Sequence, residues 1–273
     1  MSADERGECG TFDGSAAKWL CSVFIVSVMA LSQACSLAGQ TAFPPQPEAA
    51  GKHSGWEPVV RDNQVLAHAV FEQLERRTSN LGPMLRWDSQ GWIGTDMNRL
   101  WIKSEGFSDG HQVSDGDHEA LYDRPIPRMR YFDAQVGIRA DLDSGPRRDW
   151  AAVGMEGLAP WFFEIAPTLY IRDRGNVGGR VEGSWEINVT QRLVLEPQAE
   201  LNFYNKNDAP RKLGSGFSDF DGGVRLRYEI RRKFAPYLGF AYNGSFNGSA
   251  TYARQSGEAT HTASFIYGIR VWY

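Results

Sequence analysis

The chain has 273 residues, which is enough for one large domain, and a formal net charge of −4 at pH 7. This charge gives no indication of a nucleic-acid partner, which would favour a basic surface. No segment contains the roughly 20 consecutive apolar residues that a membrane-spanning helix needs.

The N-terminal part of the sequence is typical of an exported protein. Residues 19–31 are apolar, follow Lys18 and precede small residues, which is the order found in a secretory signal peptide. We therefore predict a signal peptide over residues 1–38, cleaved after Ala38; a buried helix is the alternative. All three cysteines lie before this site, so the mature chain is expected to form neither a disulfide nor a zinc–thiolate site.

Residues 39–68 contain several prolines among small and polar residues and show no hydrophobic period. This composition favours a flexible segment, and we predict a periplasmic leader here.

Residues 69–273 consist of strand-like segments separated by turn residues. The pattern is clearest in 217–231, where Val224, Leu226 and Tyr228 alternate with Arg225 and Arg227. Successive side chains of a strand point to opposite faces, so this strand has one apolar and one charged face. The predicted strands are 69–77, 84–94, 98–107, 117–126, 129–141, 148–158, 161–172, 176–189, 192–205, 217–231, 234–247 and 261–273; the alternation is mixed in 69–77 and 148–158.

Apolar-out, polar-in strands of roughly ten residues are typical of a transmembrane β-barrel. The sequence therefore predicts an all-β fold, an up-and-down antiparallel barrel of about 12 strands, with 10 as the alternative if 69–94 does not pair. A soluble β-sandwich would bury its apolar face, and a lipocalin-like barrel would place apolar residues inside. The expected location is the bacterial outer membrane, with its lipid around the barrel.

The predicted connections alternate in length, apart from a tight loop at 173–175. Those near 95–97, 127–128, 159–160, 190–191 and 232–233 are short; those at 78–83, 108–116, 142–147, 206–216 and 248–260 are longer. Outer-membrane barrels have short periplasmic turns and longer outside loops, so both termini of the barrel are expected in the periplasm.

Several long segments carry a resemblance to a known family. They are DSQGWIGTDMNRLWIKSEG (88–106), EALYDR (119–124), DAQVGIRAD (133–141), GLAPWFFE (157–164), TQRLVLEPQAELNFYNKND (190–208) and GSGFSDFDGGVRLRYEIRRKFAPY (214–237). Together they resemble the bacterial copper resistance protein B family over about residues 65–273. The resemblance implies an outer-membrane barrel of copper resistance or homeostasis, usually beside a periplasmic multicopper oxidase.

The sequence departs from the family in the leader, which in many members is rich in Met and His. Here residues 39–83 contain His53 and His68 and no methionine, so copper storage by the leader is not expected.

Copper ions are the metal that the resemblance implies, and thioether and imidazole groups suit them. The candidate ligands are Met97, His111, His118 and His68. Residues 108–119 hold the densest cluster, which places His111, Asp115, Asp117, His118 and Glu119 in one predicted outside loop. This loop is read either as a weak site for a divalent metal or as an acidic, solvated loop.

The inward-facing charges form a second set of candidates. Both signs are mixed among them, which favours mutually neutralising pairs over a selective ring; an ion path is the alternative. They are Arg99, Lys103, Glu105, Asp133, Arg139, Glu164, Arg180, Glu182, Glu186, Glu196, Glu200, Arg225, Arg227, Glu229 and Arg270.

No arrangement of a nucleophile with a nearby histidine is visible in the sequence, so an enzyme is not expected. The predicted function is an outer-membrane barrel of copper resistance that binds copper or aids its handling. A general small-solute porin and a barrel hydrolase are the alternatives.

Overall fold

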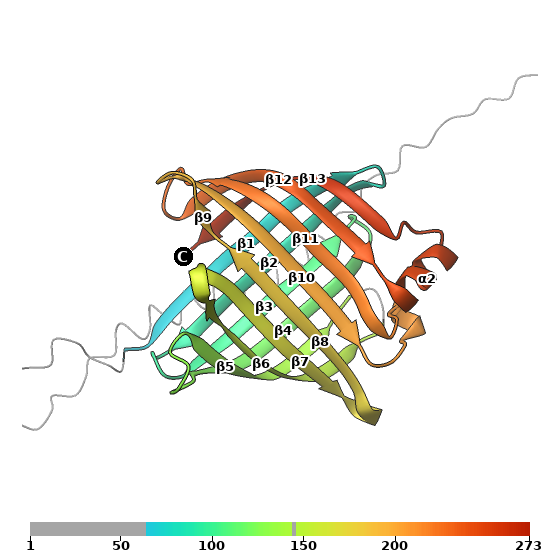
Figure 1. The fold of residues 1–273 in the computed structure, drawn as a ribbon, viewed down its shortest axis with the longest axis horizontal. Helices are drawn as coiled ribbons and strands as arrows, with labels where there is room; N and C mark the ends of the chain where they lie inside the picture. The colour runs from blue at the N-terminus through green and yellow to red at the C-terminus, as the bar shows by residue number, and fades with distance from the viewer. Residues whose placement is uncertain (1–63, 144–145) are drawn as a thin grey trace, which may run out of the picture. The chain divides into compact units, whose positions relative to one another are not determined.

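The computed structural model describes residues 64–143 and 146–273, in which antiparallel strands close into a barrel (Figure 1). The predicted signal peptide and most of the predicted leader lie outside the described residues. In the described part, no helix is long and apolar enough to cross a membrane.

Apart from one short strand, each strand pairs with its neighbour in the chain. The first strand also pairs with the last, so the sheet has no free edge at that seam. The strands are β1 (Leu66–Ser79), β2 (Gly82–Gly94), β3 (Arg99–Ser108), β4 (Val113–Pro125), β5 (Phe132–Asp141), β6 (Arg148–Ala159), β7 (Phe163–Arg172), β8 (Asn176–Trp185), β9 (Ile187–Asn188), β10 (Leu193–Tyr204), β11 (Gly216–Tyr228), β12 (Phe234–Ser245) and β13 (His261–Trp272). The prediction of a twelve-stranded antiparallel barrel is confirmed, with β9 as one additional short strand.

β9 continues the path of β8, and the sequence predicted both as one strand. The pairing with β10 keeps one register, from Gln198 opposite Ser184 to Leu195 opposite Ile187. The interruption falls where this register sets Pro197 against the end of β8. Proline has no N–H to donate to the ladder, which explains the local loss of strand pairing.

The barrel has two different ends. The turn end carries the β2–β3, β4–β5, β6–β7, β9–β10 and β11–β12 connections together with Tyr273, and the loop end carries the others. Short 3-10 turns lie at both ends: η1 (Pro160–Phe162), η2 (Asp173–Gly175) and η3 (Ala209–Arg211). The predicted alternation of short and long connections holds only in part, because the β1–β2 loop is limited to residues 80–81, whereas the β4–β5 turn spans residues 126–131.

The loop end contains a helix, α2 (Asn247–Gln255), which the sequence did not predict. Its buried residues are Ser249, Ala250 and Ala253. The Ser249 hydroxyl accepts the N–H of Gly214 at 2.8 Å and lies 2.7 Å from the Ser218 hydroxyl. Tertiary packing against β11 stabilises this helix, because a helix of this length is marginal on its own.

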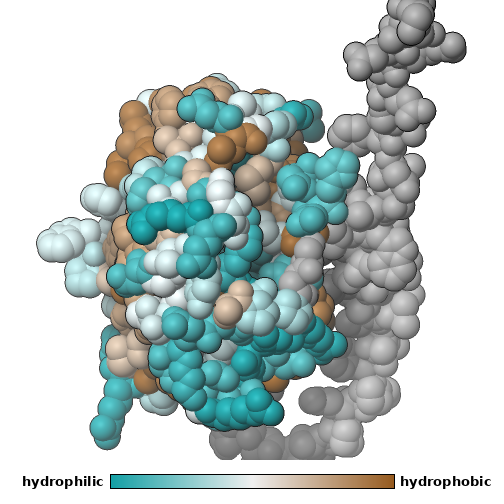
Figure 2. All heavy atoms as spheres, turned by 90° about the vertical axis from the view of Figure 1, so that its right-hand side faces the viewer, coloured by the Kyte–Doolittle hydropathy of each residue, from teal (hydrophilic) through white to brown (hydrophobic). Residues whose placement is uncertain are grey.

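The two faces of the strands are as predicted. On β11, Val224 is 46% exposed on the outside, whereas the neighbouring Arg225 is 4% exposed in the lumen. Leu226 and Arg227 repeat this relationship. Figure 2, which looks onto the side of the molecule that carries α2, shows hydrophilic residues over much of that face and hydrophobic residues toward its margins.

The structure also explains the two strands with mixed alternation. A β-bulge in β1 between Phe71 and Gln73 turns both Glu72 and Gln73 toward the lumen. In β6 the alternation is regular, but its inward face carries the apolar Trp150 and Ala152. The bulge in β1 shifts the alternation by one residue. In β6 both faces carry apolar residues, so the alternation cannot be recognised from the sequence.

Candidate functional site: the charged lumen and its two cavities

The lumen of the barrel is filled with buried ion pairs. Glu75 is fully buried and is held by Arg225 at 3.0 Å and by Arg77 at 2.8 Å. Arg227, which is 2% exposed, donates to Glu186 at 2.6 Å and to Glu196 at 2.5 Å. A buried charge needs a partner in this way, so the predicted mutual neutralisation is present across much of the interior.

A layer of charged side chains crosses the middle of the lumen. Arg180 of β8 donates to Glu105 of β3 and to Asp117 of β4, and it lies 3.2 Å from a carboxylate oxygen of Glu200. Arg139 of β5 reaches the same Asp117 at 2.6 Å. Glu105, Asp117 and Arg180 line both of the cavities described next, so this central layer lies between them.

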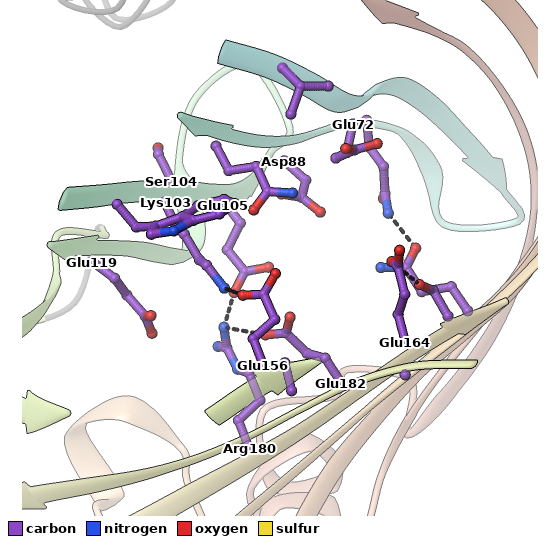
Figure 3. Close-up of a pocket in the computed structure, with 18 of the residues that line it drawn as sticks. Glu72, Asp88, Lys103, Ser104, Glu105, Glu119, Glu156, Glu164, Arg180 and Glu182 are labelled. Carbon is purple, nitrogen blue, oxygen red and sulfur yellow. Dashed lines mark hydrogen bonds and ion pairs between the residues drawn. The ribbon is translucent and has the colours of Figure 1, made fainter. Parts of the chain in front are cut away.

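The turn-end cavity has a volume of about 380 Å³ and is strongly acidic (Figure 3). Ten carboxylates line it against three cationic side chains, which are Lys103, Arg180 and Arg270. The carboxylates belong to Glu72, Asp88, Glu105, Asp117, Glu119, Glu156, Glu164, Glu182, Glu186 and Glu196. Negative charge therefore exceeds positive charge around this cavity.

Pairing in the turn-end cavity is uneven. Lys103 contacts Glu156 at 2.7 Å, as Figure 3 shows. Glu164 accepts a hydrogen bond from the Ser184 hydroxyl at 3.0 Å, and Glu182 lies 3.5 Å from the shared Arg180. Among the described residues, neither Asp88 nor Glu164 forms an ion pair. These two carboxylates are therefore available to an incoming cation.

One wall of the lumen is apolar and aromatic. Leu121, Trp150, Ala152 and Tyr170 form a buried cluster there. The Tyr170 hydroxyl donates to the carboxylate of Glu119 at 2.5 Å, so this wall also orients one of the cavity's acidic groups.

The loop-end cavity, of about 440 Å³, is lined by residues of the β10–β11 connection and of α2. Arg148 of β6 donates to Asp208 through Nε at 2.9 Å and Nη2 at 3.1 Å. This hydrogen-bonded guanidinium holds the pKa of Asp208 below its ordinary value. Arg211 pairs with Asp143, so the same connection is linked to the β5–β6 loop.

Lys212 pairs with Glu258 beyond α2, so the β10–β11 connection is joined to the β12–β13 loop as well. Ion pairs thus join three loops beside the loop-end cavity.

The four predicted copper ligands do not come together. Met97 is 51% exposed in the β2–β3 turn at the turn end. His68 lies in β1, where its ring centroid is 5.7 Å from that of Trp272, and it lines the turn-end cavity. His111 and His118 belong to the β3–β4 region at the loop end. Among the four, only His68 lines the acidic turn-end cavity.

The predicted loop at 108–119 is shorter in the structure, which corrects the sequence interpretation. Ser108 pairs with Val113, so only residues 109–112 connect β3 and β4. The Asp109 carboxylate accepts the backbone N–H groups of His111 at 2.8 Å and Gln112 at 2.7 Å, which closes this turn and lowers the pKa of Asp109.

The longer β4 strand separates the residues of the predicted cluster. Asp117 and Glu119 are buried toward the lumen, whereas His118 has the opposite parity and shares the outward face with Ala120 and Tyr122. Alternation along a strand thus places the histidine and the carboxylates on different sides of the wall.

Sequence reasoning missed several charged residues of the lumen. Asp117, Glu119 and Asp123 follow a clear period of two, which could have identified them. Arg86 and Asp88 on β2 follow the same period. Glu72 had no such signal, because it enters the lumen through the bulge in β1.

The donor atoms of the lumen can be compared with what copper prefers. In the described residues, no group of three His, Cys, Asp or Glu side chains is arranged to hold a metal ion. Carboxylates surround the turn-end cavity, with the imidazole of His68 on its lining. Oxygen and imidazole donors fit a divalent ion such as Cu(II) better than Cu(I), which prefers sulfur.

Comparison with known proteins identifies the family. Residues 65–273 match the family model described as Copper resistance protein B precursor (CopB). The chain is 37% identical over 221 residues to a Copper resistance protein B homolog of Pseudomonas syringae pv. tomato, covering 81% of this chain and 74% of that protein. It is 34% identical over 215 residues to Copper resistance protein B of Escherichia coli, covering 79% of this chain and 72% of that protein.

Among solved structures, the NanC porin matches 75% of this chain and 98% of its own, with a TM-score of 0.47 and 13% identity. A loop-deletion mutant of OmpT from Vibrio cholerae matches 78% of this chain and 100% of its own, with a TM-score of 0.35 and 9% identity. The family match includes every strand of the barrel, from β1 to β13. The two relatives match this chain over 74% and 72% of their own length. The chain belongs to the copper resistance protein B family.

Proposed function

We propose that this protein lies in the bacterial outer membrane and handles copper ions there as cargo, without a catalytic reaction. The turn end faces the periplasm in this proposal, because short turns and the chain ends of such barrels lie on that side. The turn-end cavity then receives copper from the periplasm and holds it as Cu(II).

The observation that supports this proposal is the charge imbalance of the turn-end cavity. Ten carboxylates against three cationic groups attract cations into a space walled by protein. Asp88 and Glu164, which are not ion-paired with described residues, and the imidazole of His68 are the groups that we propose bind the ion. The cavity ends at the central layer around Arg180, which favours retention of the ion over free passage.

The same layer distinguishes this proposal from a general porin. A porin needs a continuous aqueous channel, whereas here Arg180 bonds to Glu105 and Asp117 across the lumen at the level where the two cavities adjoin. We further propose that a periplasmic multicopper oxidase works beside the protein, as the family resemblance suggests; copper held at the turn end would be accessible to such a partner.

Copper stoichiometry of the purified protein, measured by elemental analysis, tests the proposal. The cavity variant is Asp88→Asn/Glu164→Gln/Glu182→Gln, and the matched control is Asp149→Asn/Asp173→Asn/Glu258→Gln, which removes three exposed carboxylates at the loop end. We expect the cavity variant to lose copper and the control to retain it. Unchanged copper in the cavity variant would contradict the site.

The role in resistance is tested in cells by deleting the gene. We expect lower tolerance to copper salts, restored by the unmodified gene and not by the cavity variant. Unchanged tolerance, together with non-selective conductance of the purified protein in planar bilayers, would favour the porin.

A further inference from the structure

The exposed charges of the two barrel ends differ in how they are paired. At the loop end, two exposed cations have carboxylate partners: Arg147 contacts Asp149 at 2.9 Å, and Lys212 contacts Glu258. At the turn end, a group of exposed cations has none within the described residues. This basic rim consists of Arg192, Arg231, Arg232 and Lys233.

The four residues of the basic rim lie on neighbouring turns. Arg192 is in the β9–β10 turn, and its carbonyl oxygen accepts the N–H of Glu229 at 2.8 Å. This bond joins it to the β11–β12 turn that carries the other three. Lys233 lies over the rings of Trp272 and Tyr273, with its Nζ 5.5 Å and 4.6 Å from the ring centroids. The backbone therefore gathers four cations at one part of the turn-end edge.

A second group of cations follows on another turn, with exposed aromatic side chains between the two. Arg124, Arg128 and Arg130 are exposed at the β4–β5 connection. In the β6–β7 turn, Trp161 is 84% exposed and Phe162 is 79% exposed, both with a left-handed backbone. Aromatic rings at this level are typical of the boundary between lipid and water.

The basic rim is continuous with the outward apolar surface of the barrel. Tyr228, Ile230 and Phe234 are exposed beside it, at 47%, 51% and 39%. The cations therefore lie where the apolar outer face ends, which is the level of lipid headgroups around a membrane barrel. A protein partner in the periplasm would instead be expected to dock away from this boundary.

From these observations we propose that the basic rim binds the phosphate groups of anionic phospholipids in the leaflet at the turn end. The positive charges complement the headgroup, and the adjoining apolar residues contact its acyl chains. Four neighbouring cations give the surface a preference for a phospholipid with net negative charge over a zwitterionic one.

Lipid selectivity is measured on the full chain reconstituted in phosphatidylcholine bilayers. A trace of spin-labelled phosphatidylglycerol or spin-labelled phosphatidylcholine is added, and the motionally restricted fraction gives the relative association constant of each. We expect a preference of about tenfold for phosphatidylglycerol, weakened by salt, because each cation near an anionic surface contributes to binding.

The rim variant Arg192→Gln/Arg231→Gln/Arg232→Gln/Lys233→Gln should lose most of this preference. The control Arg147→Gln/Arg174→Gln/Lys206→Gln/Lys212→Gln removes the same charge at the loop end and should keep it. Heat-modifiable migration on gels verifies that both variants form closed barrels. Equal association of the two lipids with the unmodified protein would overturn the proposal. The basic rim would then be expected to bind an acidic protein and not a lipid. Equal loss in both variants would also overturn it, because net charge would then account for the effect.

Discussion

Arg180 of β8 and Glu105 of β3 form an ion pair across the barrel, although 75 residues separate them in the chain. Both side chains line the turn-end and the loop-end cavity. The pair therefore lies where the two cavities adjoin. Carboxylates outnumber cationic side chains on both linings, by ten to three at the turn end and by nine to five at the loop end.

Removing the central layer should join the two cavities. The variant Arg180→Ala/Glu105→Ala takes away one charge of each sign, so the net charge of the lumen is unchanged, and Asp117 keeps Arg139 as a partner. We expect the variant to show single-channel conductance in planar bilayers that the unmodified protein lacks. Arg147→Ala/Asp149→Ala, an exposed pair at the loop end, is the control. Equal conductance of the unmodified protein would show that the layer does not close the lumen.

The two faces of β11 should respond differently to substitution. Val224 faces outward and Arg225 inward. Val224→Arg places a charge on the lipid face, which costs roughly 2–4 kcal/mol near the bilayer midplane. Arg225→Leu deprives the buried Glu75 of a partner and should lower the free energy of unfolding by about 3–5 kcal/mol.

Urea unfolding of the reconstituted protein distinguishes these two effects when a second substitution is added to each variant. Adding Glu75→Gln should recover part of the loss in Arg225→Leu and none of the loss in Val224→Arg. Rescue of the Val224 variant would mean that the faces are assigned incorrectly.

Copper binding should depend on His68 and not on His118. The imidazole of His68 lines the acidic turn-end cavity, whereas His118 lies on the outward parity of β4. We expect His68→Ala to reduce the copper measured by elemental analysis and His118→Ala to leave it unchanged. A triple Met97/His111/His118 alanine variant should also retain copper. Loss of copper from this triple variant would instead place the binding site among these three residues.

The link between Arg148 and Asp208 should make the β10–β11 connection sensitive to acid. Because the pKa of Asp208 in the folded protein lies below its ordinary value, the link stabilises the connection above the ordinary aspartate pKa and is lost as the pH falls through the lowered pKa. Amide hydrogen exchange of residues 205–215, corrected for intrinsic rates, should therefore accelerate at acidic pH. Asp208→Asn should accelerate exchange at neutral pH and remove the pH dependence; an unchanged profile would exclude this carboxylate as the cause.

Tyr273 should contribute to closure of the barrel. Its N–H donates to the Ala69 carbonyl oxygen at 2.8 Å, and its carbonyl oxygen accepts the Ala69 N–H at 3.1 Å. Deleting Tyr273 removes both bonds from the β1–β13 seam and the ring beneath Lys233. We expect slower assembly in refolding followed by gel migration, while Tyr273→Phe should assemble normally because it keeps the backbone bonds and the ring.

The fold was predictable because a barrel strand encodes its two faces in a period of two. Val224, Arg225, Leu226 and Arg227 are enough to assign the faces of β11, and the short turn between β11 and β12 constrains the register of that pair. The prediction weakened where this local rule is broken. The bulge near Glu72 shifts the period, and Trp150 gives the lumen an apolar patch.

The sequence by itself determined the antiparallel barrel, its outward apolar face and its charged interior, since these depend on neighbours along one strand. Only the tertiary structure decided which charges meet. Arg180 reaches Glu105 and Asp117 because closure of the sheet brings β8 opposite β3 and β4, and no spacing in the sequence records that distance. For the same reason, His68 lies at one end of the barrel and His111 at the other, whereas carboxylates from strands far apart in the chain surround a common cavity.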